Sequence, residues 1–225
     1  MVRTTVDDAV CTVTLDRPGK RNALTRETLR DLETAVADAT APVLVLRGAG
    51  EAFCAGADLD VIADLDADTA AEFAALGQRV ARSIETYDGA VVAAVDGAAR
   101  GGGVELALAC DLRIASPAAT FAETGVRLGL FGAWGGTVRL PRIVGESAAM
   151  DLALTGRTVD ADEALRLGLV SRVADDPQQV ATEVAAVDHG ALRRLKGLLR
   201  GDGDRERREA RERAAFAELI AVRQN

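Results

Sequence analysis

The chain of 225 residues contains a single histidine, and this scarcity excludes several kinds of catalytic site. A metal site built from several imidazoles is ruled out, and Ser-His-Asp or Cys-His catalysis would have to recruit that one side chain. His189 stands in a Val-Asp-His-Gly stretch far from every other promising motif. We therefore expect a structural role for His189 and no bound metal.

Cysteine is rare as well, with Cys11, Cys54 and Cys110 only. Their number is odd, they lie far apart and they follow no CxxC spacing, which disfavours a disulfide framework or a zinc site and favours a reducing compartment. The sequence also has no basic start followed by an apolar stretch, and charged residues break its longest apolar runs. These absences predict a cytoplasmic protein without a signal peptide or a membrane span.

Positive charge is in deficit, since 27 Lys and Arg face 35 Asp and Glu, for a formal net charge of -8. Contact with nucleic-acid phosphates needs a basic surface, so nucleic acid is not an expected partner. The content of 48% hydrophobic and 28% charged residues is typical of a globular protein. The length suits one large domain, or a core with a small helical annex.

Apolar residues recur with the periods of an α/β protein. Residues 1–15 alternate between apolar and polar types around a turn at Asp7-Asp8, which predicts a β-hairpin. Thr25 is placed to cap a helix, because Leu29 and Leu32 follow it at helical spacing. Buried strands are expected at 42–46, 90–95 and 112–115, helices at 68–85 and 104–110, and a glycine-bearing loop at 48–56. This order of strand, loop, helix and strand favours α/β layers.

From Gly145 onward the pattern is mostly helical, with expected helix stops at Gly156 and Gly168. The last helix is rich in Arg and Glu between Arg205 and Arg213, which is typical of a solvated face. Its other face carries Phe216, Leu219 and Ile220, so we expect this helix to dock on an apolar surface.

Two glycine-bearing loops follow apolar strands and are the most informative features of the sequence. The first is Phe53-Cys54-Ala55-Gly56-Ala57-Asp58-Leu59, and the second is Gly97-Ala98-Ala99-Arg100-Gly101-Gly102-Gly103-Val104-Glu105. Glycines let a ligand approach the backbone closely. Neither loop has the Gly-Lys-Ser/Thr or the GxGxxG pattern, which disfavours a nucleotide triphosphate or dinucleotide site.

The second loop places a carboxylate beside free backbone donors. Gly102 is expected to begin a helix, and Glu105 lies about one turn later on the same face. The N–H groups at a helix start carry partial positive charge and can hold an oxyanion, while the glutamate can move a proton or orient water. A surface glutamate is the plainer interpretation, but the apolar neighbours of Glu105 favour a functional one. This pairing suits enolate chemistry.

An ordered set of motifs resembles the enoyl-CoA hydratase/isomerase (crotonase) superfamily from about Val13 to Phe216. The motifs are Leu15-Asp16-Arg17-Pro18, Asn22-Ala23-Leu24, Phe53-Cys54-Ala55-Gly56-Ala57-Asp58-Leu59, Ala93-Ala94-Val95-Asp96-Gly97, Gly101-Gly102-Gly103-Val104-Glu105-Leu106, Cys110-Asp111-Leu112-Arg113-Ile114-Ala115 and Gly135-Gly136-Thr137-Val138-Arg139-Leu140. Each motif is weak alone, whereas the ordered set is specific.

The resemblance implies a crotonase-like α/β fold, with a ββα spiral core at 1–175 and a short C-terminal helical region for oligomerisation at 176–225. It implies that the N–H groups of Ala57 and Gly102 form an oxyanion hole for the thioester oxygen of an acyl-CoA. It also implies a homotrimer or a dimer of trimers. No cofactor is expected, because coenzyme A is part of the substrate.

The resemblance also implies a set of residues that bind the acyl-CoA. These residues are Ala55, Gly56, Asp58, Leu59, Gly101 and Trp134. From the residues themselves, Asp58 is expected first of all to hold its loop by bonding backbone N–H groups. Trp134, the only tryptophan, is expected either to line the acyl pocket or to pack in the core.

The catalytic residues depart from the family pattern. Hydratases of this superfamily have two glutamates, of which the first falls on Glu105, but the second falls on position 125, where this chain has glycine. Glu123 is two residues away, and on an extended segment its side chain points to the same side as position 125. We therefore take Glu105 and Glu123 as the candidate catalytic residues, with a surface position of Glu123 as the alternative.

The sequence therefore predicts an enoyl-CoA hydratase that adds water to a 2-enoyl-CoA. An isomerase or a decarboxylase of the same fold would use the same enolate chemistry. A non-catalytic acyl-CoA-binding protein is the alternative from another class, motivated by Gly125 and the short C-terminus. The acyl chain that the protein prefers does not follow from these residues.

Overall fold

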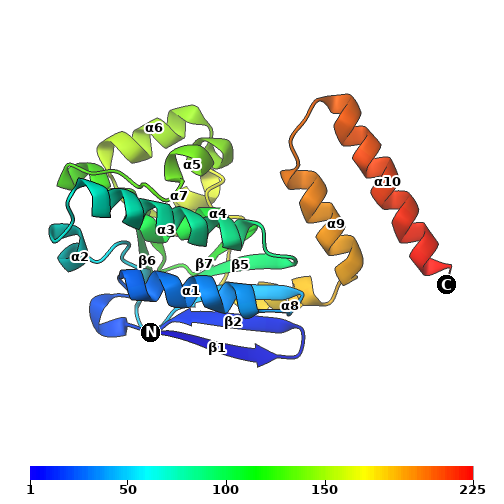
Figure 1. Ribbon diagram of the computed structural model, residues 1–225, viewed down its shortest axis with the longest axis horizontal. Coiled ribbons are helices and arrows are strands. Elements are labelled where there is room, and N and C mark those ends of the chain that lie inside the picture. The colour runs from blue at the N-terminus through cyan, green and yellow to red at the C-terminus, as the bar shows by residue number, and fades with distance from the viewer. Residues whose placement is uncertain (225) are drawn as a thin grey trace.

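The structure is a computed structural model that describes residues 1–224, and its core consists of two β-sheets surrounded by helices (Figure 1). The six-stranded sheet has the order β1-β2-β3-β5-β7-β10, and the four-stranded sheet has the order β4-β6-β8-β9. The strands are β1 (Val2–Asp7), β2 (Val10–Leu15), β3 (Val43–Gly48), β4 (Ala52–Cys54), β5 (Ala90–Val95), β6 (Ala98–Arg100), β7 (Leu112–Ala115), β8 (Thr120–Ala122), β9 (Val159–Asp160) and β10 (Arg172–Val173).

The larger sheet confirms the strands expected from the apolar runs. β1 and β2 form the predicted antiparallel hairpin, in which Val2 pairs with Leu15. The strands β2, β3, β5, β7 and β10 are parallel neighbours. Every residue of β5 is buried, as expected for an unbroken apolar strand that is covered on both faces.

Helices surround the sheets, and several of them begin where the sequence predicts. They are α1 (Arg26–Asp38), α2 (Leu59–Ala63), α3 (Ala67–Glu85), α4 (Gly102–Ala109), α5 (Gly136–Val144), α6 (Glu146–Thr155), α7 (Ala161–Arg166), α8 (Gln179–Ala185), α9 (His189–Arg200) and α10 (Arg205–Arg223), with short 3-10 helices η1 (Pro18–Lys20) and η2 (Thr124–Leu128). The side chain of Thr25 caps α1 by accepting the Thr28 N–H at 3.1 Å. α4 starts at Gly102, two residues earlier than the apolar run alone indicates.

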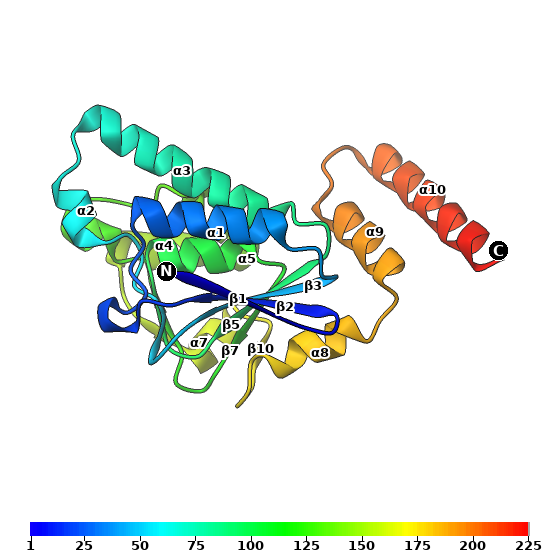
Figure 2. The ribbon, with the colours of Figure 1, turned by 60° about the horizontal axis from the view of Figure 1, so that its bottom comes forward.

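The chain winds through repeated units of strand, strand and helix. β3 of the larger sheet leads to β4 of the smaller sheet and then to α2 and α3; β5 leads to β6 and α4; β7 leads to β8, η2 and α5. Successive units place their strands side by side and parallel in both sheets. This arrangement confirms the ββα spiral, and Figure 2 shows α1, α3 and α4 together on one side of the larger sheet.

The smaller sheet was not anticipated from the sequence. The segment expected to be a loop at 48–56 contains the strand β4, and β10 interrupts the region expected to be mostly helical. These strands have two or three residues each, which is too short for an apolar period to be recognised. The helix α5 was also missed, because Gly135 precedes it, Gly136 begins it and Pro141 lies within it.

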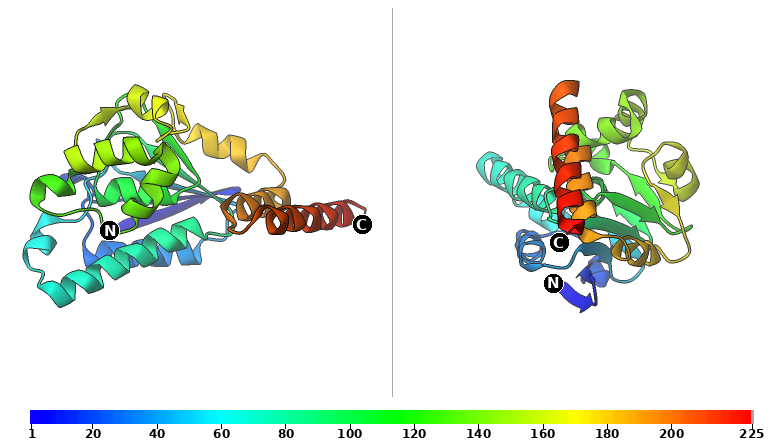
Figure 3. Two further views of the ribbon diagram at one scale, coloured as in Figure 1. Left: turned by 90° about the horizontal axis from the view of Figure 1, so that it is seen from above. Right: turned by 90° about the vertical axis from the view of Figure 1, so that its right-hand side faces the viewer.

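The C-terminal helices are placed differently from one another. α8 packs on the larger sheet, with Val180 and Ala181 buried in the cluster that contains Val43 and Val92. α9 and α10 form a pair beyond one end of the sheet, with α10 farther from the core (Figures 1 and 3). Phe216 on α10 is 67% exposed, so the apolar docking expected for this helix is not completed within the chain.

Among residues 1–224, no helix combines the length and apolar character that a bilayer crossing needs.

Candidate active site

Strand pairing in the smaller sheet brings the two glycine-bearing loops together. β4 and β6 are parallel neighbours, so the loops that follow them leave the sheet at the same edge. Gly56 has a φ of +85°, and a Cβ built on it would lie 2.6 Å from the Arg100 carbonyl oxygen and 3.1 Å from the Gly102 nitrogen. The backbones of the two loops are therefore in direct contact, and only glycine fits at position 56.

Two backbone N–H groups are left without partners at this contact. Leu24 forms a bridge to the first loop, in which its N–H donates to the Gly56 oxygen at 2.8 Å and its oxygen accepts the Asp58 N–H at 3.0 Å. These two bonds involve the residues before and after Ala57, so the Ala57 N–H takes no part in the bridge. Gly102 is the first residue of α4, so its N–H has no partner within the helix. Within residues 1–224, neither amide donates a hydrogen bond.

Asn22 supports the first loop from behind, a role that the sequence motif alone did not reveal. Its buried Nδ2 donates to the backbone oxygens of Ala49, Ala52 and Phe53 at 2.7–3.3 Å. Asn22 has a φ of +58°, a conformation that asparagine tolerates better than most residues. It therefore holds the strand β4 and the entry to the loop in place.

Asp58 holds the other end of the first loop, as the sequence predicts. Its Oδ1 caps α2 by accepting the Asp60 N–H at 3.1 Å, and its Oδ2 accepts a hydrogen bond from Arg17 at 3.0 Å. Burial alone raises the pKa of the Asp58 carboxyl, but the hydrogen bonds from Arg17 and the Asp60 backbone outweigh it, so the pKa lies below its ordinary value. The carboxylate thus stays charged and structural.

The remaining loop residues lie around the two free amides. The Ala55 N–H donates to the Arg21 oxygen at 2.9 Å, and Leu59 is 59% exposed at the start of α2. Gly101 precedes α4 with a φ of +45°, and its N–H donates to the Ala122 oxygen at 2.9 Å. Ala55 and Gly101 are thus fixed by backbone bonds, while the Leu59 side chain is free to contact another molecule.

Glu105 is 1% exposed, and one of its carboxylate oxygens is held by backbone donors. Its Oε1 accepts the N–H groups of Trp134 at 2.8 Å and Gly136 at 2.6 Å. The carboxyl also fills the space in front of Gly132, where a Cβ would lie 2.7 Å from its carbon. Burial raises the pKa of Glu105, and the two N–H bonds and the charge of Arg139 act in the opposite direction.

Glu123 lies close enough to Glu105 for the two carboxyls to interact electrostatically. It follows β8, is 9% exposed, and its buried Oε1 has no hydrogen-bond partner in the described chain. Burial raises the pKa of Glu123 to about 8, with a further contribution from the negative charge of Glu105. The surface alternative for Glu123 is therefore wrong.

The backbone fills the space at position 125. A Cβ on Gly125 would lie 2.9 Å from the Phe131 Cα, and the Gly125 oxygen accepts the Leu130 N–H at 2.9 Å. A glutamate at this position would require the Leu130–Phe131 segment to move. The path of the Leu130–Phe131 backbone is therefore compatible with glycine at position 125 and not with a larger residue.

Trp134 covers the start of α4. Its ring is 3% exposed and stacks edge-on against Phe73, with ring centroids 5.6 Å apart. A Cβ on either Gly77 or Gly102 would overlap with the indole ring. The core-packing role of Trp134 is thus shown, and its contact with an acyl group stays a prediction.

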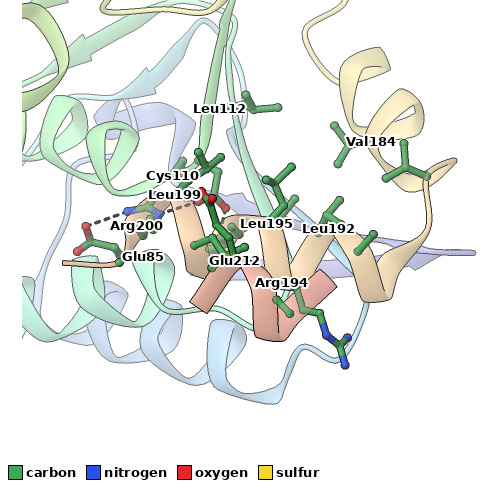
Figure 4. A pocket seen from close by; sticks show the side chains of 18 of the residues that line it. Glu85, Cys110, Leu112, Val184, Leu192, Arg194, Leu195, Leu199, Arg200 and Glu212 are labelled. Carbon is green, nitrogen blue, oxygen red and sulfur yellow. Dashed lines mark hydrogen bonds and ion pairs between the residues drawn. The ribbon is translucent and has the colours of Figure 1, made fainter. Parts of the chain in front are cut away.

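Other candidate features lie outside this site. The His189 Nε2 lies 2.9 Å from the Ala185 oxygen, and within residues 1–224 no group of His, Cys, Asp and Glu side chains could hold a metal ion. A cavity of about 1470 Å³ lies between the core and the α9–α10 pair (Figure 4). None of the predicted site residues lines this cavity.

Comparison with known proteins gives consistent matches. Residues 5–196 match the family model for enoyl-CoA hydratase/isomerase. A crotonyl-CoA hydratase from Syntrophomonas wolfei is 41% identical over 186 residues, which are 80% of this chain and 71% of the relative. A short-chain-enoyl-CoA hydratase from Clostridium acetobutylicum is 40% identical over 178 residues, covering 77% of this chain and 68% of the relative.

Solved structures match over nearly the whole chain. The enoyl-CoA hydratase from Thermoplasma volcanium GSS1 superimposes with a TM-score of 0.94 at 31% identity, covering 98% of this chain and 92% of the other. A candidate enoyl-CoA hydratase from Thermobifida fusca YX, in complex with acetoacetyl-CoA, gives a TM-score of 0.90 at 31% identity and covers 98% and 95% of the two chains.

The close contact at the start of α4 can be tested with Gly102→Ala. The new methyl group would overlap with the Trp134 ring, so we expect a loss of stability of about 1–3 kcal/mol and an altered fluorescence emission of this only tryptophan. Gly19→Ala is the matched control, because no atom lies within 4 Å of the added Cβ. Unchanged emission and unchanged unfolding midpoint in Gly102→Ala would contradict the contact.

Proposed function

Because this chain belongs to the enoyl-CoA hydratase/isomerase (crotonase) family, we propose that it is an enoyl-CoA hydratase that adds water to the double bond of a 2-enoyl-CoA thioester. The observation that carries this proposal is the pair of unpartnered N–H groups of Ala57 and Gly102 beside the buried carboxylate of Glu105. Each feature serves a different part of the reaction.

The two N–H groups would act on the thioester carbonyl. When water attacks the β-carbon, negative charge develops on the carbonyl oxygen as an enolate forms. The Ala57 and Gly102 N–H groups would donate to this oxygen, and the amino end of α4 adds partial positive charge. Donors that are already in place stabilise this charge without rearrangement, and one such donor is typically worth about 3 kcal/mol.

Glu105 is suited to act as the base. The N–H groups of Trp134 and Gly136 bind its Oε1, which leaves Oε2 to accept a proton from water. Since two backbone N–H groups stabilise the charged form of Glu105 and the buried Oε1 of Glu123 has no partner among the described residues, Glu105 is the carboxyl that ionises first. Two carboxyls whose environments separate their pKa values in this way are typical of an acid and base pair.

Glu123 is suited to act as the acid. With a pKa raised to about 8, it holds a proton at neutral pH and can deliver it to the α-carbon. The oxygen of water bonds to the β-carbon while Glu105 accepts the proton that the water loses. Glu123 then donates its proton to the α-carbon. Proton transfer from Glu105 to Glu123 through water then restores both groups for the next turnover.

The substrate would lie along the first loop and the start of α4. We propose that Ala55, Gly56, Asp58, Leu59 and Gly101 shape the coenzyme A side of the site, and that Trp134 borders the acyl group.

The chemistry requires no cofactor apart from the coenzyme A of the substrate. The three buried, unpaired cysteines suit a reducing compartment, and we place the protein in the cytoplasm.

The C-terminal region, residues 176–225, is proposed to mediate assembly into a homotrimer or a dimer of trimers. Large apolar side chains on its last two helices are exposed in the single chain. They are Leu195 (57%), Leu199 (70%), Phe216 (67%), Ile220 (37%) and Val222 (68%). Apolar side chains gathered in this way are typical of a surface that another protein chain covers.

An acyl-CoA-binding protein without turnover is the second candidate, because the backbone of Phe131 occupies the place of the second family glutamate. An isomerase or a decarboxylase would use the same two amides to stabilise an enolate. Assays with a panel of acyl-CoA chain lengths separate these candidates, since a binding protein would hold the thioesters and release no product.

Replacement of the proposed base tests the main proposal. Glu105→Gln should lower kcat for hydration of crotonyl-CoA by roughly 100- to 10,000-fold, because it removes the group that accepts the proton of water. Glu72→Gln is the control, since that side chain is 74% exposed and pairs with Arg26. A wild-type protein that binds crotonyl-CoA tightly without hydrating it would overturn the hydratase proposal.

The pH dependence tests the proposed acid. Glu123 must carry its proton to act, so kcat/KM should fall as the pH rises through about 8, where this carboxyl ionises. In Glu123→Gln the rate should be lower by about 100-fold and this fall at high pH should disappear. A wild-type rate that stays flat between about pH 7 and pH 10, or a fall that persists in Glu123→Gln, would rule out this role.

The oligomeric state is measured by sedimentation of the full chain. We expect the mass of a trimer or a hexamer, and we expect Phe216→Asp to shift it toward the monomer with an unchanged circular dichroism spectrum. Val6→Asp, at an equally exposed valine on β1, should leave the assembly intact. A monomeric wild-type protein at all concentrations would exclude the proposed assembly.

A further inference from the structure

The backbone segment that holds Glu105 is itself held by Arg139. This arginine lies on α5, and its guanidinium turns back to donate to the Trp134 oxygen at 3.1 Å. Gly135 has a φ of +103°, and a Cβ at this position would overlap with the Arg139 guanidinium. The N–H groups that bind Glu105 therefore belong to a segment whose position depends on Arg139.

Arg139 is connected in turn to α3 and then to α9. Its second nitrogen pairs with the Glu85 Oε2 at 2.6 Å. The Glu85 Oε1 accepts a hydrogen bond from Arg200 at 2.8 Å, as Figure 4 shows. Glu85 is the last residue of α3 and Arg200 is the last residue of α9. A single carboxylate thus joins the segment around Trp134 to the C-terminal region.

The end of α9 has further polar attachments to the core. Arg200 pairs with Asp111 at 2.8 Å and donates to the Ala109 oxygen at 3.0 Å. Lys196 pairs with Asp111 at 2.9 Å and donates to the oxygens of Tyr87 and Gly89. Both anchors converge on the end of α4 and the start of β5, so the docking of α9 fixes the position of the Arg200 guanidinium.

The charges of Arg139, Glu85 and Arg200 also affect the ionisation of groups in and near the active site. Burial alone raises the pKa of Glu85, but the hydrogen bond and charge of Arg139, with the charge of Arg200, lower it below its ordinary value. Glu85 is therefore ionised and able to hold both arginines. Arg139 also acts electrostatically to lower the pKa of Glu105. Displacement of Arg139 would then affect both the position and the proton affinity of Glu105.

We propose that Arg139 and Glu85 are positioning residues, through which the docking of α9 on the core sets the geometry of Glu105. The ion-pair run consists of Arg139, Glu85 and Arg200, and it begins at the oxygen of Trp134, whose N–H binds Glu105. This inference rests on the proposed role of Glu105 as a base. According to this proposal, the C-terminal region affects the position of Glu105 in addition to its proposed role in assembly.

A role confined to stability would have different consequences from a positioning role. Loss of a structural ion pair lowers the unfolding temperature and the folded fraction, but it leaves the pH profile of the remaining folded enzyme unchanged. Loss of a positioning contact shifts the pH at which Glu105 becomes active. For Arg139 the direction of that shift follows from the charge, since removal of its positive charge raises the pKa of Glu105.

The experiment compares four variants of the full chain in the hydration of crotonyl-CoA. Arg139→Gln, Glu85→Gln and Arg200→Gln each interrupt the ion-pair run at a different residue. Arg194→Gln is the matched control, because this α9 arginine pairs with Glu218 of α10 at 3.2 Å and lies outside the run. The kcat, KM and pH profile are measured for each variant, together with the emission of Trp134.

We expect kcat to fall about tenfold or more in Arg139→Gln, with smaller losses in Glu85→Gln and Arg200→Gln and a nearly unchanged KM. In Arg139→Gln the rise of kcat/KM with pH should move to higher pH. In all three variants the Trp134 emission should change. Arg194→Gln should match the wild type in both respects. An unshifted profile in Arg139→Gln, or unchanged emission in the three variants, would overturn the proposal, even if their stability is lower.

The emission measurement also separates this inference from the proposed function. If the wild-type protein hydrates no thioester, the hydratase proposal fails, but Trp134 still reports whether the run controls its segment. An emission change that is equal in Arg194→Gln and Arg200→Gln would show a general effect of α9 and would likewise contradict the proposal.

Discussion

The contact between the backbones of the two glycine-bearing loops is the constraint on which the site depends. It is imposed by the parallel pairing of β4 with β6 and completed by Gly56, which has no side chain to separate the first loop from Gly102. Among the described residues, 1–224, the same approach leaves the Ala57 and Gly102 N–H groups without partners. Unpaired donors are unfavourable in a folded chain, and a ligand oxygen that accepts from both removes that penalty.

The two carboxyls illustrate how the surroundings assign different roles to the same chemical group. Both are almost completely buried, which by itself disfavours their charged forms. Glu105 receives two backbone N–H bonds and lies near Arg139, whereas Glu123 has no such compensation at its buried oxygen. The resulting difference in proton affinity supports the proposed roles of Glu105 as the base and Glu123 as the acid, although position 125 carries no acid.

The parts of the fold that depend on local patterns could be predicted from the sequence, while those that depend on distant backbone contacts could not. The β1–β2 hairpin, the cap at Thr25 and the strand β5 follow from alternation, spacing and burial. The short strands of the smaller sheet carry no recognisable period. The donors to Glu105 are backbone N–H groups, which any residue provides, and residues 85, 139 and 200 meet only in three dimensions.

A crystal structure of this protein with acetoacetyl-CoA bound would locate the thioester oxygen in the site, and a structural relative has been solved with that ligand. We predict that the thioester oxygen accepts hydrogen bonds from both the Ala57 and the Gly102 N–H groups at about 3 Å, with Glu105 and Glu123 facing the adjoining carbons. A thioester oxygen bound to neither amide, or bound at another part of the surface, would show that these two amides are not an oxyanion hole.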